Sequence, residues 1–359
     1  MRKFSVAVFS GLLILVLAAQ ALAVNYTEEV PLPELGSDTY LGVQGGLYPG
    51  GSNAIPPAYQ AEVDAAIAQL EADNSIGFQC VGMSNLTHTC DELIARAATA
   101  NVNPAVTIGN AGRPGRTIQV FADTPLNDVW FEHRGLSNSI VDVVVFFNAW
   151  GYPSGDFVTY LPQMTDAVRA VYSNVQQAYP NVKLIYFVSR EFAPDWAVDL
   201  NPNPYAYQDG FAYKAVIEER INGQLSGVPV VWGPYQYDDT WPHDPPPTPS
   251  YFRDPDGVHL SDAGLDYAGQ LWLDFFMTQA WFAGGPVPTA TATFTPGPTL
   301  TPSVMPTATE TAVPPTPADT PTMTPTSNGQ ETPTPTPTGC PPWNRSEERR
   351  VGKECRSRW

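Results

Sequence analysis

Five short apolar runs alternate with helical patterns along the middle of this chain, and the alternation leaves few folds open to it. Runs of this length without polar alternation are typical of parallel strands that are buried on both faces. The clearest helical pattern between them runs from Phe157 to Val175. Alternating strands and helices predict one α/β domain with a parallel sheet covered on both faces. The predicted strands are 76–83, 105–109, 140–147, 182–188 and 228–232, and the other predicted helices are 59–70, 209–221 and 262–276.

Three of these strands end in residues that could act on a ligand, and ligands bind at the carboxyl ends of parallel strands. Ser84 follows the first strand at a strand-to-helix turn, where helix N–H groups lie behind it. A glycine-rich loop at 109–117 follows the second and could turn its N–H groups toward a developing oxyanion. Asn148 ends the third and could aim its amide at the same point. Taken alone, each also fits a structural role as a helix cap, a tight turn or a strand-closing residue.

The segment before the last predicted helix offers a base for Ser84. Asp256 and His259 stand three residues apart on a turn, with Gly257 between them. This spacing brings the carboxylate within reach of one imidazole nitrogen and leaves the other free to accept a proton. An acid in this position is otherwise an ordinary helix N-cap.

The other histidines are weaker candidates for the base. His88 follows Ser84 closely, and we expect it on the first turn of the next helix, pointing away from the strand ends. His133 and His243 stand in polar loops and are expected at the surface. None of the three follows a carboxylate at the spacing of Asp256 and His259.

The N-terminal residues predict export. Met1-Arg2-Lys3 precede an apolar run from Phe4 to Leu22, which closes with Ala21-Leu22-Ala23. This order is typical of a secretory signal peptide, so we expect residues 1–23 to be removed. An uncleaved anchor is the alternative, and the short apolar core disfavours it. We therefore expect a secreted or cell-surface protein with no membrane span after signal cleavage.

The composition changes again after residue 285. Residues 286–339 are Thr-Pro repeats with few apolar side chains, which cannot bury a core and predict an extended, disordered linker. Such a linker implies tethering or a further module beyond it. Residues 340–359 turn abruptly basic, and we interpret them as a truncated or artefactual end, with a natural basic tail as the alternative. The folded domain is therefore expected over 24–285.

Charge and cysteine content disfavour several classes of partner. The formal net charge of −18 argues against nucleic acid, which requires a basic face. Cys80 and Cys90 could form a disulfide in an oxidising compartment or remain two buried thiols. The cysteine and histidine spacings match no zinc or haem site, and Asp254, Asp256 and His259 supply no ligand set by themselves. We therefore predict neither a metal nor an organic cofactor.

Taken together, these residues resemble the conserved blocks of the SGNH (GDSL-type) hydrolases. Gly82-Met83-Ser84-Asn85 is similar to the first block, and residues 110–117 to the second, Asn-Ala-Gly-x-x-Gly-x-Thr. Asn148 falls at the asparagine of the third block, and residues 256–261 match the fifth. The resemblance covers about 76–276, and the second and fifth blocks are the specific ones. Further segments resemble an exported bacterial subgroup of the family, at 45–53, 188–190, 201–207 and 232–235.

The resemblance implies a three-layer α/β/α sandwich around a five-stranded parallel sheet of the flavodoxin-like type. It implies an esterase in which Ser84 is the nucleophile, His259 the base and Asp256 the residue that orients the base. The oxyanion hole would consist of the Ser84 and Gly115 backbone N–H groups and the Asn148 side-chain amide.

Several positions depart from the family pattern. Met83 stands where the family usually has Asp, and Leu260 replaces a common Pro. Phe146 and Ala149 replace the Gly and Asp that flank the third-block asparagine. These departures favour either an unusual substrate or the alternative function. In that alternative, the chain is a catalytically inactive SGNH-like domain that binds surface or extracellular glycans.

Aromatic residues after the strand ends suggest the kind of ester. Exposed aromatic rings stack well on sugars, so an ester on a polysaccharide, such as an acetyl group, is the predicted substrate. The alternative is that these rings pack the core or steady long loops. The predicted substrate-binding residues are Trp150, Arg190, Tyr205, Trp232 and Tyr235.

Overall fold

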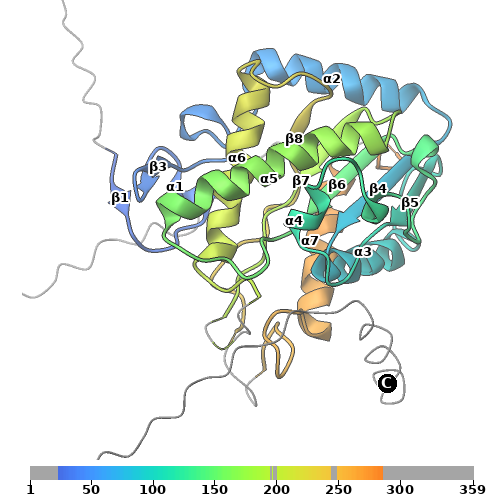
Figure 1. Ribbon diagram of the computed structural model, residues 1–359. Coiled ribbons are helices and arrows are strands. Elements are labelled where there is room, and N and C mark those ends of the chain that lie inside the picture. Colours follow the sequence, from blue (N-terminus) through green and yellow to red (C-terminus); the bar gives the residue numbers. More distant parts are fainter. Residues whose placement is uncertain (1–22, 195, 197–199, 244–248, 286–359) are drawn as a thin grey trace, which may run out of the picture. The chain divides into compact units, whose positions relative to one another are not determined.

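A parallel sheet of five strands forms the centre of the protein (Figure 1). The computed structural model describes residues 23–285 apart from 195, 197–199 and 244–248. The strand order is β5-β4-β6-β7-β8, which confirms the predicted flavodoxin-like sheet and all five predicted strands. The predicted linker, the basic end and all but the last residue of the predicted signal peptide lie outside the described residues. The strands are β4 (Ile76–Gly82), β5 (Val106–Asn110), β6 (Val143–Phe147), β7 (Leu184–Phe187) and β8 (Val230–Trp232).

Helices cover both faces of this sheet, so the domain has the predicted three layers. The strand side chains alternate between two apolar cores. In β6, Val143 and Val145 face one core while Val144 and Phe146 face the other. Burial on both sides explains why the strands read as continuous apolar runs. One face carries α2 (Pro57–Ala72), α3 (Ser84–Ala97) and α7 (Asp262–Met277), and the other carries α4 (Ile118–Phe121), α5 (Phe157–Ala178) and α6 (Tyr205–Ile221).

Helix α6 begins at Tyr205, earlier than the predicted start at Asp209. Pro204 ends the preceding loop, and the helix follows it directly. Every residue from Ala206 to Lys214 is buried. Because this part of the helix is buried on all sides, it lacks the one-sided apolar spacing on which the sequence prediction depended.

The N-terminal segment adds a small sheet that the sequence analysis did not predict. Its strands are two residues long. Strands β1 and β2 are parallel, and strands β2 and β3 are antiparallel. The Tyr40 ring on β2 packs against Phe157 and Tyr207, with ring centroids 5.1 and 4.9 Å apart. The elements are β1 (Asn25–Tyr26), α1 (Leu32–Leu35), β2 (Thr39–Tyr40) and β3 (Val43–Gln44), and the short 3-10 turns of the domain are η1 (Pro49–Gly51), η2 (Asp128–Trp130) and η3 (Asn138–Ile140).

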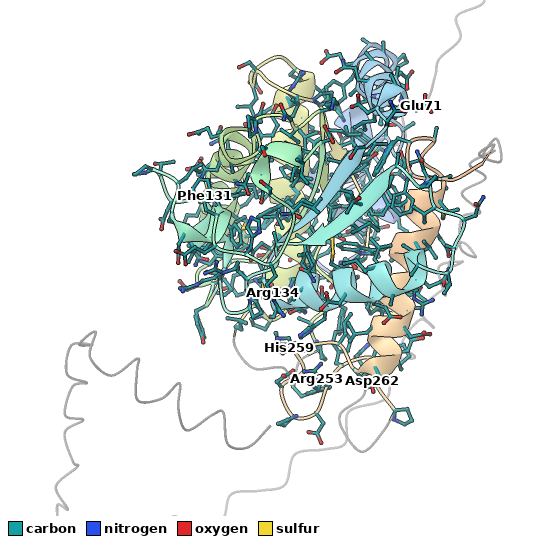
Figure 2. All side chains as sticks on the ribbon, turned by 90° about the vertical axis from the view of Figure 1, so that its right-hand side faces the viewer. Glu71, Phe131, Arg134, Arg253, His259 and Asp262 are labelled. Atoms are coloured by element: carbon teal, nitrogen blue, oxygen red, sulfur yellow. A yellow bond between two sulfur atoms is a disulfide. The ribbon has the colours of Figure 1, made fainter. Side chains whose placement is uncertain are left out.

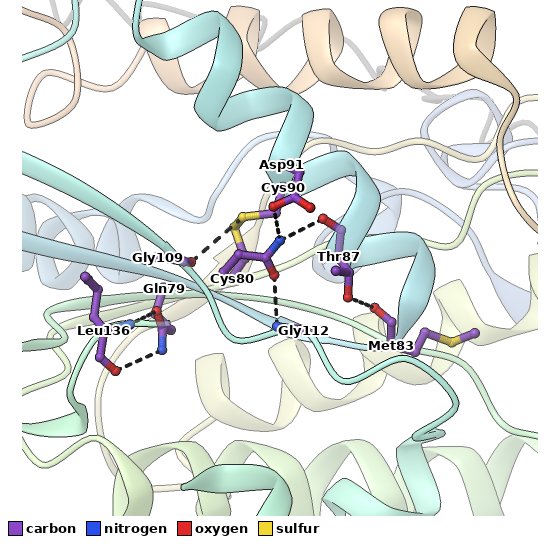
Figure 3. The surroundings of a disulfide bond; sticks show 10 residues. Gln79, Cys80, Met83, Thr87, Cys90, Asp91, Gly109, Gly112 and Leu136 are labelled. Carbon is purple, nitrogen blue, oxygen red and sulfur yellow. Dashed lines mark hydrogen bonds between the residues drawn. A yellow bond between two sulfur atoms is a disulfide. The ribbon is translucent and has the colours of Figure 1, made fainter. Parts of the chain in front are cut away.

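A disulfide joins Cys80 on β4 to Cys90 on α3 (Figure 3). The two cysteines lie on either side of the turn that carries Ser84. Near the same turn, Thr87 donates hydrogen bonds from its backbone N–H and its hydroxyl to the Met83 carbonyl, at 3.0 and 2.9 Å. The strand, the turn and the first part of the helix are therefore fixed to one another.

The last described residues return to the amino end of β5. The Asn103 N–H donates to the Phe282 carbonyl at 2.8 Å, and the Gly284 N–H donates to the Asn101 carbonyl at 2.7 Å. Figure 2 shows Glu71 toward this end of the molecule and His259 toward the opposite end. Among the described residues no helix combines the length and apolar character needed to cross a membrane.

Candidate active site

Ser84 is the first residue of α3, and only Met83 separates it from the end of β4 at Gly82. Gly82 permits the close approach of this turn to β6, since a Cβ atom there would lie 1.9 Å from the Phe147 carbonyl oxygen. The Ser84 N–H is one of the first four in the helix, which have no acceptor within the helix. Ser84 is only 6% exposed, so its hydroxyl is largely screened from bulk water.

Asp256 and His259 lie on a short hairpin between β8 and α7. The Arg253 N–H donates to the His259 carbonyl at 2.7 Å, and Phe252 forms an antiparallel bridge with Leu260. Asp256 Oδ1 accepts from the backbone N–H groups of Val258 and His259 at 2.9 and 3.0 Å. Burial raises the pKa of Asp256, but the hydrogen bonds from His259 and Val258 outweigh it and hold the pKa below its usual value of 3.8.

The three predicted triad residues meet in one hydrogen-bonded series. Asp256 Oδ2 lies 2.9 Å from His259 Nδ1, and His259 Nε2 lies 2.8 Å from Ser84 Oγ. Ser84 and His259 are 175 residues apart in the chain, so only the fold brings them together. In this arrangement the imidazole can accept the hydroxyl proton, and the carboxylate can stabilise the imidazolium that forms.

The two other predicted oxyanion donors lie on neighbouring loops. Gly115 has a φ of +75° in a turn where the Arg116 N–H donates to the Arg113 carbonyl at 3.0 Å. The Arg113 N–H donates to the Gly82 carbonyl at 2.7 Å, which holds this loop against the end of β4. Asn148 is fully buried, and its side-chain amide donates to the Arg116 carbonyl at 3.2 Å. Asn148 therefore fastens the loop that carries Gly115.

The prediction that His88 points away from the strand ends is wrong. Its ring centroid lies 5.5 Å from that of His259. The physical reason is the helical period, because residues four apart, such as Ser84 and His88, share one face of a helix. Burial lowers the pKa of His88, and the nearby charges of His259 and Arg253 lower it further, against the opposite effect of Asp91 and Asp256.

A buried polar group that the sequence analysis missed supports the turn after Ser84. The Asn85 side-chain amide donates to the Glu191 carboxylate and, at 2.7 Å, to the Val258 carbonyl. Asn85 thus connects the helix of Ser84 with the hairpin of His259. The Arg190 guanidinium contacts the same Glu191 carboxylate at 2.9 Å, and both side chains are 1% exposed.

This group extends away from Ser84 through Asn201. Arg190 Nε donates to Asn201 Oδ1 at 3.1 Å, and Asn201 donates to the Trp150 carbonyl at 3.1 Å. Asp209 lies beyond, where it accepts a hydrogen bond from Tyr160. Burial raises the pKa of Asp209 to about 8 in spite of the hydrogen bond from Tyr160 and the charge of Arg190.

The structure places the predicted substrate-binding residues largely inside the protein. Arg190 is enclosed with Glu191, and Trp232 is buried with its indole N–H donating to the Leu47 carbonyl at 2.7 Å. The Tyr205 hydroxyl donates to the Gly155 carbonyl at 2.7 Å, and the Tyr235 hydroxyl accepts from the Leu32 N–H at 3.0 Å. Trp150 is partly buried and packs its ring against that of Tyr160. This placement agrees with the alternative that such rings steady the core and the loops.

A cavity of about 290 Å³ lies between α3 and the loop after β5, and none of the three candidate triad residues lines it. Thr87 and Asp91 of α3 line it together with Asn110 and Gly112 of the second family block and with Arg134. Within the described ranges no group of three or more His, Cys, Asp or Glu side chains could hold a metal ion.

Neither a protein-family model nor a curated protein matches this chain, whereas solved structures do. One, described as a proposed platelet activating factor from Streptococcus pneumonia, is 16% identical with a TM-score of 0.37, covering 61% of this chain and 94% of that one. A proposed SGNH hydrolase from Slackia heliotrinireducens is 14% identical with a TM-score of 0.31, covering 56% and 99%. A proposed arylesterase from Agrobacterium tumefaciens is 14% identical with a TM-score of 0.32, covering 56% and 97%. The sequence blocks of this chain resemble those of the SGNH hydrolases, and one of these solved structures carries that description.

Proposed function

We propose that the protein is an exported serine esterase that hydrolyses carboxylic ester bonds through an acyl-enzyme. The observation that carries this proposal is the hydrogen-bonded series from Asp256 through His259 to Ser84. It lies at the carboxyl ends of the strands, where parallel sheets bind ligands. Export rests on the predicted signal peptide at residues 1–23.

In the proposed reaction, Ser84 Oγ attacks the ester carbonyl while His259 Nε2 accepts the hydroxyl proton. The tetrahedral oxyanion faces the backbone N–H groups of Ser84 and Gly115. His259 then returns the proton to the departing alcohol, which leaves Ser84 acylated. Water, activated by the same imidazole, releases the acid and restores Ser84. Asp256 holds the imidazole in the correct orientation throughout.

Asn148 has a separate part in this proposal. Its amide donates to the Arg116 carbonyl and so sets the position of Gly115. It would donate to the oxyanion only by exchanging that bond for one to the substrate. Losing one oxyanion donor typically lowers kcat by about 10²–10³.

We further propose that the ester is carried by a polysaccharide, as an acetyl group would be. The predicted export and the predicted Thr/Pro-rich linker favour an extracellular polymer as substrate. The partly buried rings of Trp150 and Tyr205 leave only part of their surface for stacking on a sugar.

Labelling with a fluorophosphonate tests the proposal directly, because the probe reacts with an activated serine. The chain from Val24 onward is treated with the probe, digested and analysed by mass spectrometry. We expect one adduct on the peptide that contains Ser84, no adduct in Ser84→Ala and strongly reduced labelling in His259→Ala. A folded sample without any adduct would contradict the esterase.

A glycan-binding domain without hydrolytic activity is a second candidate. It is favoured by the Asn148 amide, which is engaged with Arg116, and by Met83, which is buried where the family has an acid. In that case the folded chain binds acetylated oligosaccharides in calorimetry and leaves both the ester and the probe intact.

A further inference from the structure

The peptide unit between Val258 and His259 is held at both of its polar groups. Its carbonyl oxygen accepts a hydrogen bond from the Asn85 side-chain amide at 2.7 Å, and its N–H donates to Asp256 Oδ1 at 3.0 Å. A peptide unit is planar and ends at the Cα atom of the following residue, so these two bonds together set the position of the His259 Cα atom. The imidazole extends from that atom, and its direction therefore depends on both bonds.

One of the two bonds starts beside Ser84, because Asn85 is the next residue of α3. The Asn85 side chain is buried, and its Oδ1 atom lies 3.5 Å from Ser84 Oγ. His259 Nε2 lies much closer to the same hydroxyl, at 2.8 Å. A contact of 3.5 Å is at the limit of a hydrogen bond, so the hydroxyl stays directed at the imidazole. Asn85 thus connects Ser84 with His259 without competing for the hydroxyl proton.

Glu191 determines which way the Asn85 amide faces. One amide hydrogen donates to the Val258 carbonyl and the other to Glu191 Oε1. Both partners are acceptors, so only the NH₂ group of the amide can face them. Glu191 Oε1 also accepts from the Arg190 guanidinium at 2.9 Å, whereas Glu191 Oε2 is buried and has no hydrogen-bond partner among the described residues. One carboxylate oxygen therefore carries both contacts.

We infer that Asn85 and Glu191 are positioning residues for the proposed reaction. Glu191 orients the Asn85 amide, and Asn85 holds the His259 imidazole at reacting distance from Ser84. The inference rests on the proposed esterase activity and adds to it two residues that act through His259. A displacement of about 1 Å between reacting groups can cost about 10² in rate, so loss of the Asn85 amide should slow the chemistry and leave binding of the ester unchanged.

Kinetics of Asn85→Ala on 4-nitrophenyl acetate test the inference. We expect kcat to fall about 10–100-fold with KM nearly unchanged, and the rate constant of fluorophosphonate labelling at Ser84 to fall by a similar factor. The matched control is Asn138→Ala at the amino end of β6. Both hydrogens of the Asn138 amide also donate to backbone carbonyls, those of Trp130 and Ala178 at 2.9 and 3.0 Å. This control should lower the urea midpoint and leave kcat unchanged.

Two isosteric variants separate positioning from stability. Glu191→Gln keeps the oxygen that accepts from Asn85 and Arg190, and it replaces only the unpartnered Oε2 by an NH₂ group. We expect its urea midpoint to fall while kcat stays within about threefold of the wild type. Asn85→Asp keeps the shape of the side chain but turns an oxygen toward Glu191 and the Val258 carbonyl. Its kcat should fall at least as far as that of Asn85→Ala.

The outcomes separate this inference from the esterase itself. If the wild type is active and Asn85→Ala keeps its kcat, or if Asn138→Ala loses as much, the inference is overturned and the esterase stands. A kcat in Glu191→Gln as low as in Asn85→Ala overturns the role of Glu191. If Asn85→Ala does not fold, Asn85→Ser, which keeps one donor, is measured against the same control and judged in the same way.

A wild-type chain that neither hydrolyses the ester nor reacts with the probe contradicts the esterase. A crystal structure of Asn85→Ala then decides the inference alone. Displacement of His259 from Ser84 supports the positioning role, and an unchanged distance between His259 Nε2 and Ser84 Oγ overturns it.

Discussion

Two loops beside Ser84 each carry an acid next to a base, and they differ in exposure. On the hairpin after β8, the His259 and Asp256 side chains are 25% and 31% exposed. On the loop after β7, Arg190 and Glu191 are each 1% exposed. A partly exposed imidazole can be reached by a substrate, whereas an enclosed guanidinium and carboxylate hold each other in place. The first loop is therefore suited to chemistry and the second to position.

The comparison predicts that variants of the two loops fail in different ways. Ser84→Ala should lower ester hydrolysis by about 10⁴-fold or more, because it removes the proposed nucleophile. The midpoint of urea unfolding should stay close to that of the wild type. His259→Ala should behave similarly. Full activity in Ser84→Ala would show that the triad assignment is wrong.

Arg190→Ala should have its largest effect on stability. Removing the guanidinium leaves the Glu191 carboxylate buried without its ion pair, which typically costs about 3–5 kcal/mol. Urea unfolding measures the loss. Arg169→Ala, which breaks a half-exposed ion pair on α5, is the control and should cost about 1 kcal/mol or less. Equal losses in both variants would remove the distinction between the two loops.

The variant Asn148→Ala distinguishes two roles of the Asn148 amide, namely fastening the glycine-rich loop and donating a hydrogen bond to the oxyanion. If the amide donates in the transition state, kcat should fall about 10²–10³-fold with little change in KM. If it only fastens the loop through the Arg116 carbonyl, kcat should fall less and unfolding should begin at lower urea. Steady-state kinetics and urea unfolding on one preparation distinguish the two results.

The smallest expected effect is the contribution of His88 to the loss of stability at acidic pH. Its pKa is lowered from 6.5 by burial first and by the charges of His259 and Arg253 next, so the unfolded chain binds its proton before the folded chain does. Stability contributed by neutral His88 is therefore lost as the pH falls below 6.5. Asp256 affects stability only at lower pH. Because its pKa is lowered, its stabilising contribution is present above pH 3.8 and is lost only below that value.

His88→Gln should accordingly weaken the dependence of unfolding free energy on pH between 7.5 and 5. Urea unfolding at several pH values in this range measures it, with wild type as the reference. An unchanged slope would mean that His88 does not titrate differently in the folded protein.

The strands and the pairing of Asp256 with His259 could be predicted from the sequence because both depend on local patterns. Strands buried on two faces are continuous apolar runs, and Asp256 and His259 bond to each other within three residues. The contact from His259 to Ser84 depends on the fold, and only the resemblance to SGNH hydrolases anticipated it. His88 was misplaced although its spacing of four from Ser84 was available as a signal.

Other features left no readable pattern. Arg190 and Glu191 are adjacent charged residues, which usually lie at the surface, and only their apolar neighbours Val188 and Phe192 hint at burial. Strands of two residues, such as β2, are too short for an alternation to appear. The partners of Asn85 come from distant loops, so no spacing could have indicated them.

The return of residues 282–284 to the amino end of β5 has a practical consequence for handling the protein. A tag or surface linker joined after Gly285 would be attached near the amino end of β5, whereas Ser84 follows the carboxyl end of the neighbouring strand β4. Immobilisation on a sensor chip through that point would leave the hairpin of His259 facing the flowing solution. Attachment near Arg253 would place the same chip surface against the site.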